Sequence, residues 1–271
     1  IENRLKDPKL KAGFEKYQQG GSFVKRDDVF INHIEKKMHG PLSVGYGATK
    51  DKIGPELAFG WTIGDKLDED VLIIKAAWGG KSLFRDFLSP NGRKPDAAFI
   101  QALEAKALKQ KKGKRKKKKN KPFSKEEYMK DFGHYYGLMM AGIDETLSNL
   151  KTYAPNYKGQ GYEIAGFVWF QGYNDKFSDH STSTYQENMA HFIRDVRKDL
   201  KSPKLPFVIG AMGHNGTAQK GTTKILADAQ IATALMSEFK GNVITVKTAD
   251  FWDYDAGIAF KNKKNDAATW A

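Results

Sequence analysis

The stretch that decides the fold is YEIAGFVWFQGYND, Tyr162 to Asp175. Residues 164–170 are almost wholly apolar and aromatic, which predicts a buried strand. The chain then passes without a linker into the polar turn QGYND, residues 171–175. In an open α/β sheet, ligands bind outside the carboxyl ends of the strands. The polar side chains of this turn are therefore candidate site residues before any relative is considered.

Strands and amphipathic helices alternate on both sides of this stretch. The pattern predicts further strands at 29–34 (as an edge strand), 70–78, 207–211 and 242–246. It predicts helices from Pro55 to Leu67, over 129–150, from a Thr184/Glu187 capping box to Leu200, and over 222–239. Such alternation is typical of parallel βαβ units with helices on both faces of the sheet. We predict one domain over residues 1–271, a three-layer α/β/α sandwich with a parallel sheet.

Glycine-containing polar turns follow three of the predicted strands. Gly79 and Gly80 follow the first, Gly172 the second, and Gly213 and Gly216 the third. Gly80-Lys81-Ser82 looks like the end of a phosphate-binding loop, but that motif requires a glycine at position 75, where this chain has Lys. Two interpretations of Gly79-Gly80 stay open: a tight turn without chemistry, or a backbone N–H that binds an oxyanion.

The charge of the chain is concentrated in one segment. The net charge is +13, and residues 106–121 alone hold eleven Lys or Arg and no acidic residue. We interpret residues 89–125 as a basic low-complexity insertion, and the rest of the chain is nearly neutral. Three roles stay open for the Lys run: a solvated disordered segment, which we favour, contact with a polyanion, or a localisation tract. Few aromatics interleave the lysines, which disfavours nucleic-acid stacking.

The composition excludes other classes of protein and of site. The chain has no cysteine, which excludes disulfides and thiolate chemistry and leaves the redox compartment open. No apolar run approaches the roughly 20 residues of a membrane span. No His or carboxylate cluster has metal-ligand spacing, so we expect neither a metal nor another cofactor. The chain begins with Ile1 and ends after a polar loop, and we expect both ends to be cut, which leaves localisation unknown.

Four segments, in order, resemble the SGNH, or GDSL-like, serine hydrolases and within them the sialate O-acetylesterase-like carbohydrate esterases. They are GPELAFG (54–60), VLIIKAAWGGKSL (71–83), GYEIAGFVWFQGYND (161–175) and ENMAHFIRDVRKDLKSPKLPFVIG (187–210). The resemblance covers most of the chain outside the basic insertion. It implies a flavodoxin-like sandwich. Proteins of this family are often exported.

The resemblance also implies roles for single residues. Gly80, or less favourably Gly79, matches the glycine whose N–H binds the oxyanion, and Asn174 matches the Asn side chain of the Gly-x-Asn-Asp block. Such donors matter because negative charge develops on the carbonyl oxygen only at the transition state. Gly172 would let the chain turn closely under the substrate, and Gln171 would support the site or contact substrate. We interpret Asp175 as a hydrogen-bond anchor of the turn.

Two blocks of the family are missing where they belong. No Gly-Asp-Ser or Gly-Gln-Ser nucleophile block occurs, and no Asp-x-x-His base block occurs in the C-terminal part of the chain. We therefore expect the nucleophilic Ser and the catalytic His outside this chain, and this fragment alone to be inactive. Of the visible candidates, we interpret Ser82 as a helix cap and His214 as a solvated loop histidine.

The resemblance implies a serine esterase that removes acetyl groups from sugars, with an acetylated carbohydrate as substrate. The competing hypothesis is a non-catalytic protein of the same fold that binds a polysaccharide or another polyanion through the Lys run. The substrate class comes from the resemblance, because a fold alone does not define a function.

Deletion of residues 106–121 separates these two roles. We expect the full-length protein to keep its esterase activity, because the deletion leaves all four family segments intact. Binding to heparin at low salt should be lost, because the lysines of this segment would bind the sulfate groups of heparin. An esterase activity that falls while heparin binding persists would contradict this interpretation of the segment.

Overall fold

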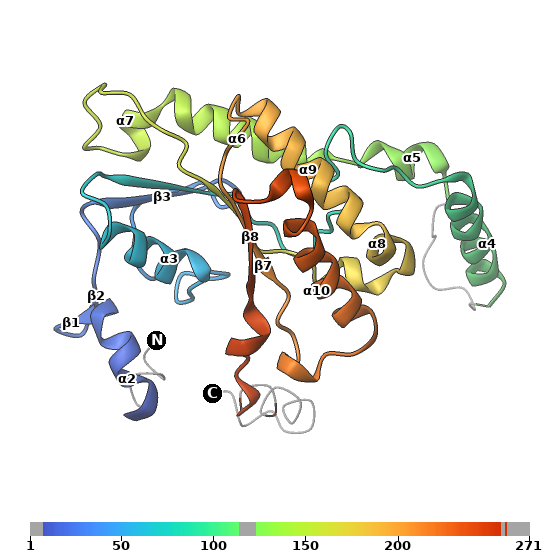
Figure 1. The fold of residues 1–271 in the computed structure, drawn as a ribbon, viewed down its shortest axis with the longest axis horizontal. Helices are drawn as coiled ribbons and strands as arrows, with labels where there is room; N and C mark the ends of the chain where they lie inside the picture. Colours follow the sequence, from blue (N-terminus) through green and yellow to red (C-terminus); the bar gives the residue numbers. More distant parts are fainter. Residues whose placement is uncertain (1–7, 114–122, 256–257, 259–271) are drawn as a thin grey trace. The chain divides into compact units, whose positions relative to one another are not determined.

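The computed structural model describes residues 8–113, 123–255 and 258. The chain divides into two compact units, which are described separately (Figure 1). Unit 1 comprises residues 1–79 and 138–162, and unit 2 comprises residues 80–137 and 163–271. Both contain parallel strands and helices, so the predicted α/β fold with a parallel sheet is confirmed. The strands of the described residues form two three-stranded sheets and one two-stranded hairpin.

Unit 1 is built on a mixed sheet whose strands lie in the order β4 (Met38–Pro41), β3 (Val29–His33) and β5 (Val71–Lys75). Its central strand β3 runs parallel to β5 and antiparallel to β4. The hairpin of β1 and β2, the helices α2, η1, α3 and α7, and most of α6 complete the unit. Their bounds are α2 Pro8–Phe14, η1 Glu15–Tyr17, β1 Gln18–Gln19, β2 Ser22–Phe23, β3 Val29–His33, β4 Met38–Pro41, α3 Pro55–Gly64, β5 Val71–Lys75, most of α6 His134–Ser148, and α7 Leu150–Tyr153.

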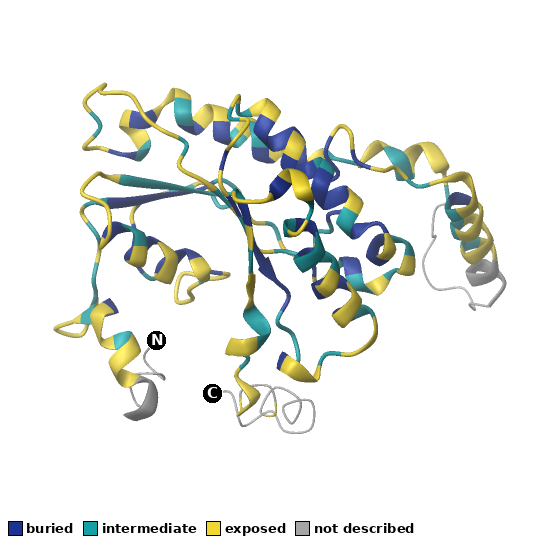
Figure 2. Cartoon of the chain, in the orientation of Figure 1, coloured by how far each residue is buried: buried dark blue, intermediate teal, exposed yellow. Residues whose placement is uncertain are grey.

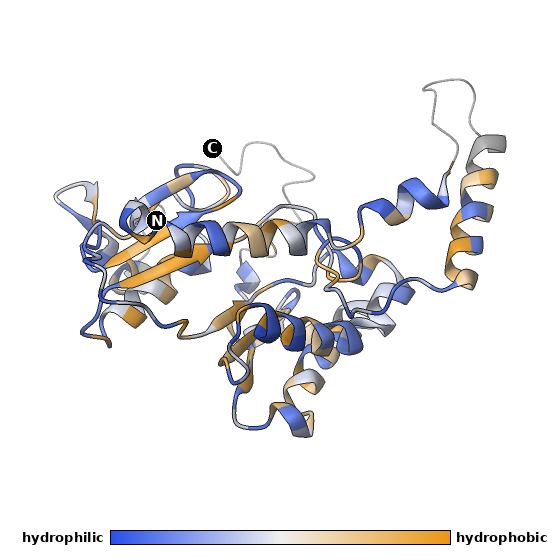
Figure 3. Ribbon diagram, turned by 90° about the horizontal axis from the view of Figure 1, so that it is seen from above, coloured by the Kyte–Doolittle hydropathy of each residue, from blue (hydrophilic) through white to orange (hydrophobic). Residues whose placement is uncertain are grey.

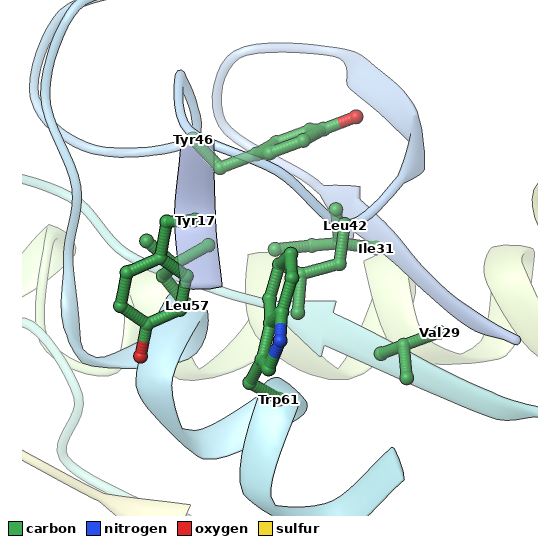
Figure 4. Close-up of a cluster of buried hydrophobic side chains, with 7 residues drawn as sticks. All are labelled: Tyr17, Val29, Ile31, Leu42, Tyr46, Leu57 and Trp61. Atoms are coloured by element: carbon green, nitrogen blue, oxygen red, sulfur yellow. The ribbon is translucent and has the colours of Figure 1, made fainter. Parts of the chain in front are cut away.

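The core of unit 1 lies between its sheet and α3. Seven buried side chains form it, and Figure 4 shows them together: Tyr17, Val29, Ile31, Leu42, Tyr46, Leu57 and Trp61. Figure 3 colours the long strands of this sheet hydrophobic for most of their length. Gly60 allows α3 to approach closely, because a Cβ there would lie 2.2 Å from Leu42 Cδ2. The predicted start of α3 is confirmed, with Pro55 in its first turn and the Gly54 N–H donating to Glu56 Oε1 at 2.9 Å.

Unit 2 is built on a parallel sheet whose strands lie in the order β6 (Phe167–Trp169), β7 (Phe207–Ala211) and β8 (Val243–Lys247). Helices α9 and α10 pack against each other, and α10 also packs on β7 and β8. The bounds are α4 Ala97–Gly113, α5 Lys125–Lys130, β6 Phe167–Trp169, η2 Asp175–Phe177, α8 Asp179–Ser183, α9 Tyr185–Asp199, β7 Phe207–Ala211, η3 Gly216–Ala218, α10 Gly221–Ala234, η4 Ser237–Phe239, β8 Val243–Lys247 and η5 Thr248–Phe251.

Phe192 of α9 lies at the centre of the core of unit 2. It is fully buried, and its ring contacts the rings of Tyr136, Phe167, Trp169 and Phe207 at centroid distances of 4.4–6.3 Å. The buried face of α9 is visible as the dark blue part of that helix in Figure 2. This contact joins α9 to the first two strands of the parallel sheet.

Several sequence predictions are wrong in detail. The strand predicted at an edge, β3, is the centre of its sheet and buried at all five positions, because Met38–Pro41 forms an unpredicted strand beside it. The strand predicted as buried over 164–170 is regular only at Phe167–Trp169. It is buried on one face, with Val168 49% exposed. The predicted polar turns do follow β5, β6 and β7.

Two predicted helices differ for local reasons. The helix predicted over 129–150 is broken at 131–133, where Gly133 has φ +75° and a Cβ would meet the Leu88 carbonyl oxygen at 2.6 Å. The predicted capping box is not formed. The hydroxyl of Thr184 donates instead to the His180 carbonyl oxygen at 2.8 Å, at the end of α8.

The basic segment is partly folded. Its first residues bond to α9: the Asn91 N–H donates to Asp195 Oδ2 and the Arg93 N–H to Asn188 Oδ1. The helix α4 then extends to Gly113. Residues 114–122, which hold most of the Lys run, lie outside the described part of the chain.

Replacing Phe192 with Ala tests this core. Because the ring is fully buried against four aromatic neighbours, we expect the free energy of unfolding to fall by about 3–5 kcal/mol. The measurement is urea denaturation followed by near-UV circular dichroism. As a control, Leu235→Ala removes a side chain that is 78% exposed and should change the value by less than about 0.5 kcal/mol. Equal effects of the two substitutions would contradict the packing.

Candidate functional site

The candidate site lies in unit 2, where the turn after β6 meets the segment that follows Gly80. Asp175 connects the two. Its Oδ2 accepts the backbone N–H of Leu83 and its Oδ1 that of Phe84, both at 2.9 Å. The carboxyl group is completely buried. Asp175 is therefore the hydrogen-bond anchor that the sequence predicted.

The backbone of Asp175 is held as firmly as its side chain. The hydroxyls of Ser181 and Thr182, at the start of α8, both donate to its carbonyl oxygen at 2.9 Å. Its N–H donates to the Gly172 carbonyl oxygen at 3.0 Å, which closes the turn. Every polar group of Asp175 thus has a partner in the protein, so the residue is unsuited to bind substrate directly.

Gln171 and Asn174 lie side by side over the backbone of Lys81. Gln171 Nε2 and Asn174 Nδ2 donate to the Lys81 carbonyl oxygen at 2.9 and 3.2 Å. Gln171 Nε2 also donates to Asp175 Oδ2 at 2.7 Å, and Gln171 Oε1 accepts the hydroxyl of Tyr185 at 3.2 Å. The Gln171 amide is fully engaged within the protein. An amide NH₂ has two hydrogens, and the contact of Asn174 with Lys81 uses one of them.

The glycines of the site have different surroundings. Gly172 has φ +143°, and a Cβ there would lie 3.0 Å from Leu226 Cδ2 and 3.1 Å from Gln230 Nε2. Position 172 is glycine because α10 approaches it closely. This requirement comes from packing within the core. Gly80 has φ +74° with open space around its Cα, and Gly79 has neither positive φ nor a close neighbour. The positive φ thus favours glycine at position 80.

Gln230 and Tyr185 support the candidate site and were not predicted from the sequence to do so. Gln230, fully buried in α10, accepts the Met212 N–H at 2.8 Å and donates to the Gln171 carbonyl oxygen at 2.7 Å, so it joins the ends of β7 and β6. The buried hydroxyl of Tyr185 accepts from Trp169 Nε1 and Gln230 Nε2. The sequence signal that could have revealed Gln230 is a polar residue on the buried face of a predicted helix.

Other predicted candidates have structural partners. Ser82 Oγ accepts the Arg85 N–H at 3.2 Å and donates to Asp86 Oδ2 at 3.0 Å, which caps a turn rather than a helix. The ring of His214 is half-buried and lies against Tyr173, with ring centroids 5.5 Å apart. His214 therefore reaches the edge of the candidate site.

An Asp-x-x-His sequence does occur, at Asp131 and His134, upstream of the turn rather than in the C-terminal part of the chain. Asp131 pairs with Arg85 at 2.9 Å, and the ring of His134 lies against Tyr135. The pair does not have the chain order that the family resemblance requires.

Within the described ranges, no group of three or more His, Asp or Glu side chains could hold a metal ion. No helix of that part of the chain has the length and hydropathy needed to cross a membrane. Among the described residues of the site, the Asn174 amide and the backbone N–H groups around Gly80 are hydrogen-bond donors.

Replacing Asp175 with Asn tests the anchor. Burial raises the pKa of Asp175 to about 6, although donors at Gln171, Phe84 and Leu83 act in the opposite direction. Between about pH 4 and 6 the folded state therefore binds a proton more tightly than the unfolded state, and the free energy of unfolding falls as pH rises. The Asn variant should lose this dependence of the free energy of unfolding on pH. At pH 7 it should be less stable by about 1–3 kcal/mol, because its NH₂ group cannot accept a backbone N–H.

The control for this prediction is Asp228→Asn, which removes one partner of an exposed i, i+4 pair with Lys224. It should change the free energy of unfolding by less than about 0.5 kcal/mol. Urea denaturation at several pH values measures both variants. An Asp175→Asn protein with an unchanged slope between pH 4 and 6 would contradict the buried anchor.

Comparisons with known proteins place the chain in a family. The sequence model of the carbohydrate esterases described as sialic acid-specific acetylesterases matches residues 123–262. A probable carbohydrate esterase of Arabidopsis thaliana is 36% identical over 56 residues, which is 21% of this chain and 22% of that protein. The match thus spans about a fifth of the length of that relative.

A solved structure of the Arabidopsis thaliana protein aligns with 82% of this chain and 69% of its own, at 17% identity and a TM-score of 0.49.

The family match covers half of the chain and includes the turn after β6, α9 and the strands β7 and β8. The chain therefore belongs to the sialic acid-specific acetylesterase family of carbohydrate esterases.

Proposed function

We propose that this chain is part of a serine esterase that removes acetyl groups from carbohydrates. Membership of the family supports the esterase class. The observation that carries the proposal is the pairing of the Asn174 side chain with the segment after Gly80, through the Lys81 carbonyl oxygen at 3.2 Å. That contact brings together the two segments to which the family resemblance assigns oxyanion donors.

In the proposed reaction, the serine oxygen attacks the acetyl carbonyl carbon while the catalytic base takes its proton. The ester bond to the sugar oxygen then breaks, and the sugar leaves as an alcohol that carries this proton. Water hydrolyses the acetyl-enzyme, which releases acetate and regenerates the serine. The Gly80 N–H and the second hydrogen of Asn174 Nδ2 would stabilise the oxyanion in both steps. We assign the nucleophile and the base to chain beyond residues 1–271, because neither family block is found at its place.

The remaining predicted site residues receive supporting roles. Gln171, with its whole amide engaged, would orient the Lys81 carbonyl and Asp175. Gly172 would hold the turn against α10, and Gly79 would precede the donor without binding substrate. The competing function, polyanion binding through the Lys run, depends mostly on residues 114–122, which lie outside the described part of the chain, and stays a prediction.

The substitution Asn174→Ala in the full-length protein tests the oxyanion assignment. Loss of one preorganised donor should lower kcat for an acetylated sugar by about 10²-fold or more, with a smaller effect on KM. The readout is acetate release at saturating and at low substrate concentration. An unchanged kcat would remove Asn174 from this role.

The matched control is Asn156→Ala. This exposed Asn donates to the Asp27 carbonyl oxygen in unit 1. Its replacement removes a similar side chain without touching the proposed site, so kcat should remain at the wild-type value.

A further inference from the structure

Two exposed aromatic side chains flank the proposed oxyanion donor. Tyr173 directly precedes Asn174 and is 50% exposed, and Phe177, three residues after Asn174, is 69% exposed. Their rings are 5.5 Å apart between centroids at an interplanar angle of 77°. Large apolar side chains that gather at the surface mark binding sites more often than isolated ones do.

The arrangement continues across the neighbouring strand ends. The ring of His214, after β7, meets Tyr173 edge-on at 5.5 Å, and Trp252, after η5, meets His214 at 5.2 Å. We refer to Tyr173, Phe177, His214 and Trp252 as the aromatic platform. All four belong to unit 2 and come from three separate loops at the carboxyl ends of β6, β7 and β8.

A cation lies on this platform. Lys176 Nζ is 3.7 Å from the centroid of Tyr173 and 5.2 Å from that of Phe177. An ammonium at an aromatic face both stabilises the arrangement and presents hydrogen-bond donors beside it. Aromatic faces with a few convergent polar donors are typical of ligand sites.

We propose that the aromatic platform binds the pyranose ring of the O-acetylated carbohydrate, with Lys176 donating to an oxygen substituent of the sugar. The C–H face of a pyranose is apolar and fits an aromatic surface, whereas its edges carry hydroxyl oxygens that accept from an ammonium. Tyr173 directly precedes Asn174 in the chain, and the proposal places the acetyl group of the bound sugar at the proposed oxyanion donors. This inference rests on the proposed esterase function and assigns its specificity to Tyr173, Phe177 and Lys176.

The test is isothermal titration of the 271-residue chain with two probes, which needs no catalysis. One probe is a mono-O-acetylated methyl pyranoside without charge, and the other is an O-acetylated pyranose that carries a carboxylate. Tyr173→Ala and Phe177→Ala should each weaken binding of both probes about 5- to 10-fold, whereas Tyr173→Phe should keep the affinity within about twofold. Lys176→Ala should weaken the carboxylate probe more than the neutral one.

Tyr162→Ala is the matched control, since it removes a 57% exposed aromatic residue in unit 1 and should leave both affinities unchanged. Equal affinities in wild type and all platform variants would overturn the proposal. So would a wild-type chain that binds neither sugar but changes its sedimentation coefficient when Tyr173 and Phe177 are replaced, because the rings would then form a protein interface.

Catalysis by the full-length protein distinguishes this proposal from the proposed function. Sugar binding that depends on the platform, in a full-length protein that hydrolyses no acetyl ester, would refute the esterase and retain the platform. Hydrolysis with platform variants that bind normally would refute the platform and retain the esterase.

Discussion

The candidate site depends on one buried carboxyl group. Asp175 accepts two backbone N–H groups, from Leu83 and Phe84, that lie more than ninety positions earlier in the sequence. A buried acceptor without such partners would cost about 1–3 kcal/mol, so the two segments are more stable together than apart. The position of Asn174 over Lys81, and with it the proposed pair of oxyanion donors, follows from this contact.

A second set of buried polar groups gives the turn its fixed orientation. Gln230 joins the backbone of Gln171 to that of Met212, and Tyr185 bonds to the Gln171 side chain. These residues come from α9 and α10, the helices that also cover the parallel sheet. The ends of β6 and β7 are therefore aligned by the same helices that form the core, and a site at this edge is supported by packed structure rather than by mobile loops.

The sequence predicted the parts of this structure that depend on local patterns. The strand Phe207–Ala211 and the start of α3 at Pro55 have the predicted bounds, because apolar runs and helix-initiating residues act over a few positions. The break at Gly133 and the unused Thr184 cap depend on contacts with Leu88 and His180, which no local pattern contains. The anchor role of Asp175 was predictable, but its partners were not, since backbone amides leave no mark in the sequence.

The most direct test of this account is hydrogen–deuterium exchange at single backbone amides, measured by NMR on the 271-residue chain at pH 7. If Asp175 joins the two segments, the amides of Leu83 and Phe84 exchange slowly in the wild-type protein. They lose that protection in Asp175→Asn, while the amides of α9 keep theirs. Fast exchange of the Leu83 and Phe84 amides in the wild-type protein would contradict the central claim.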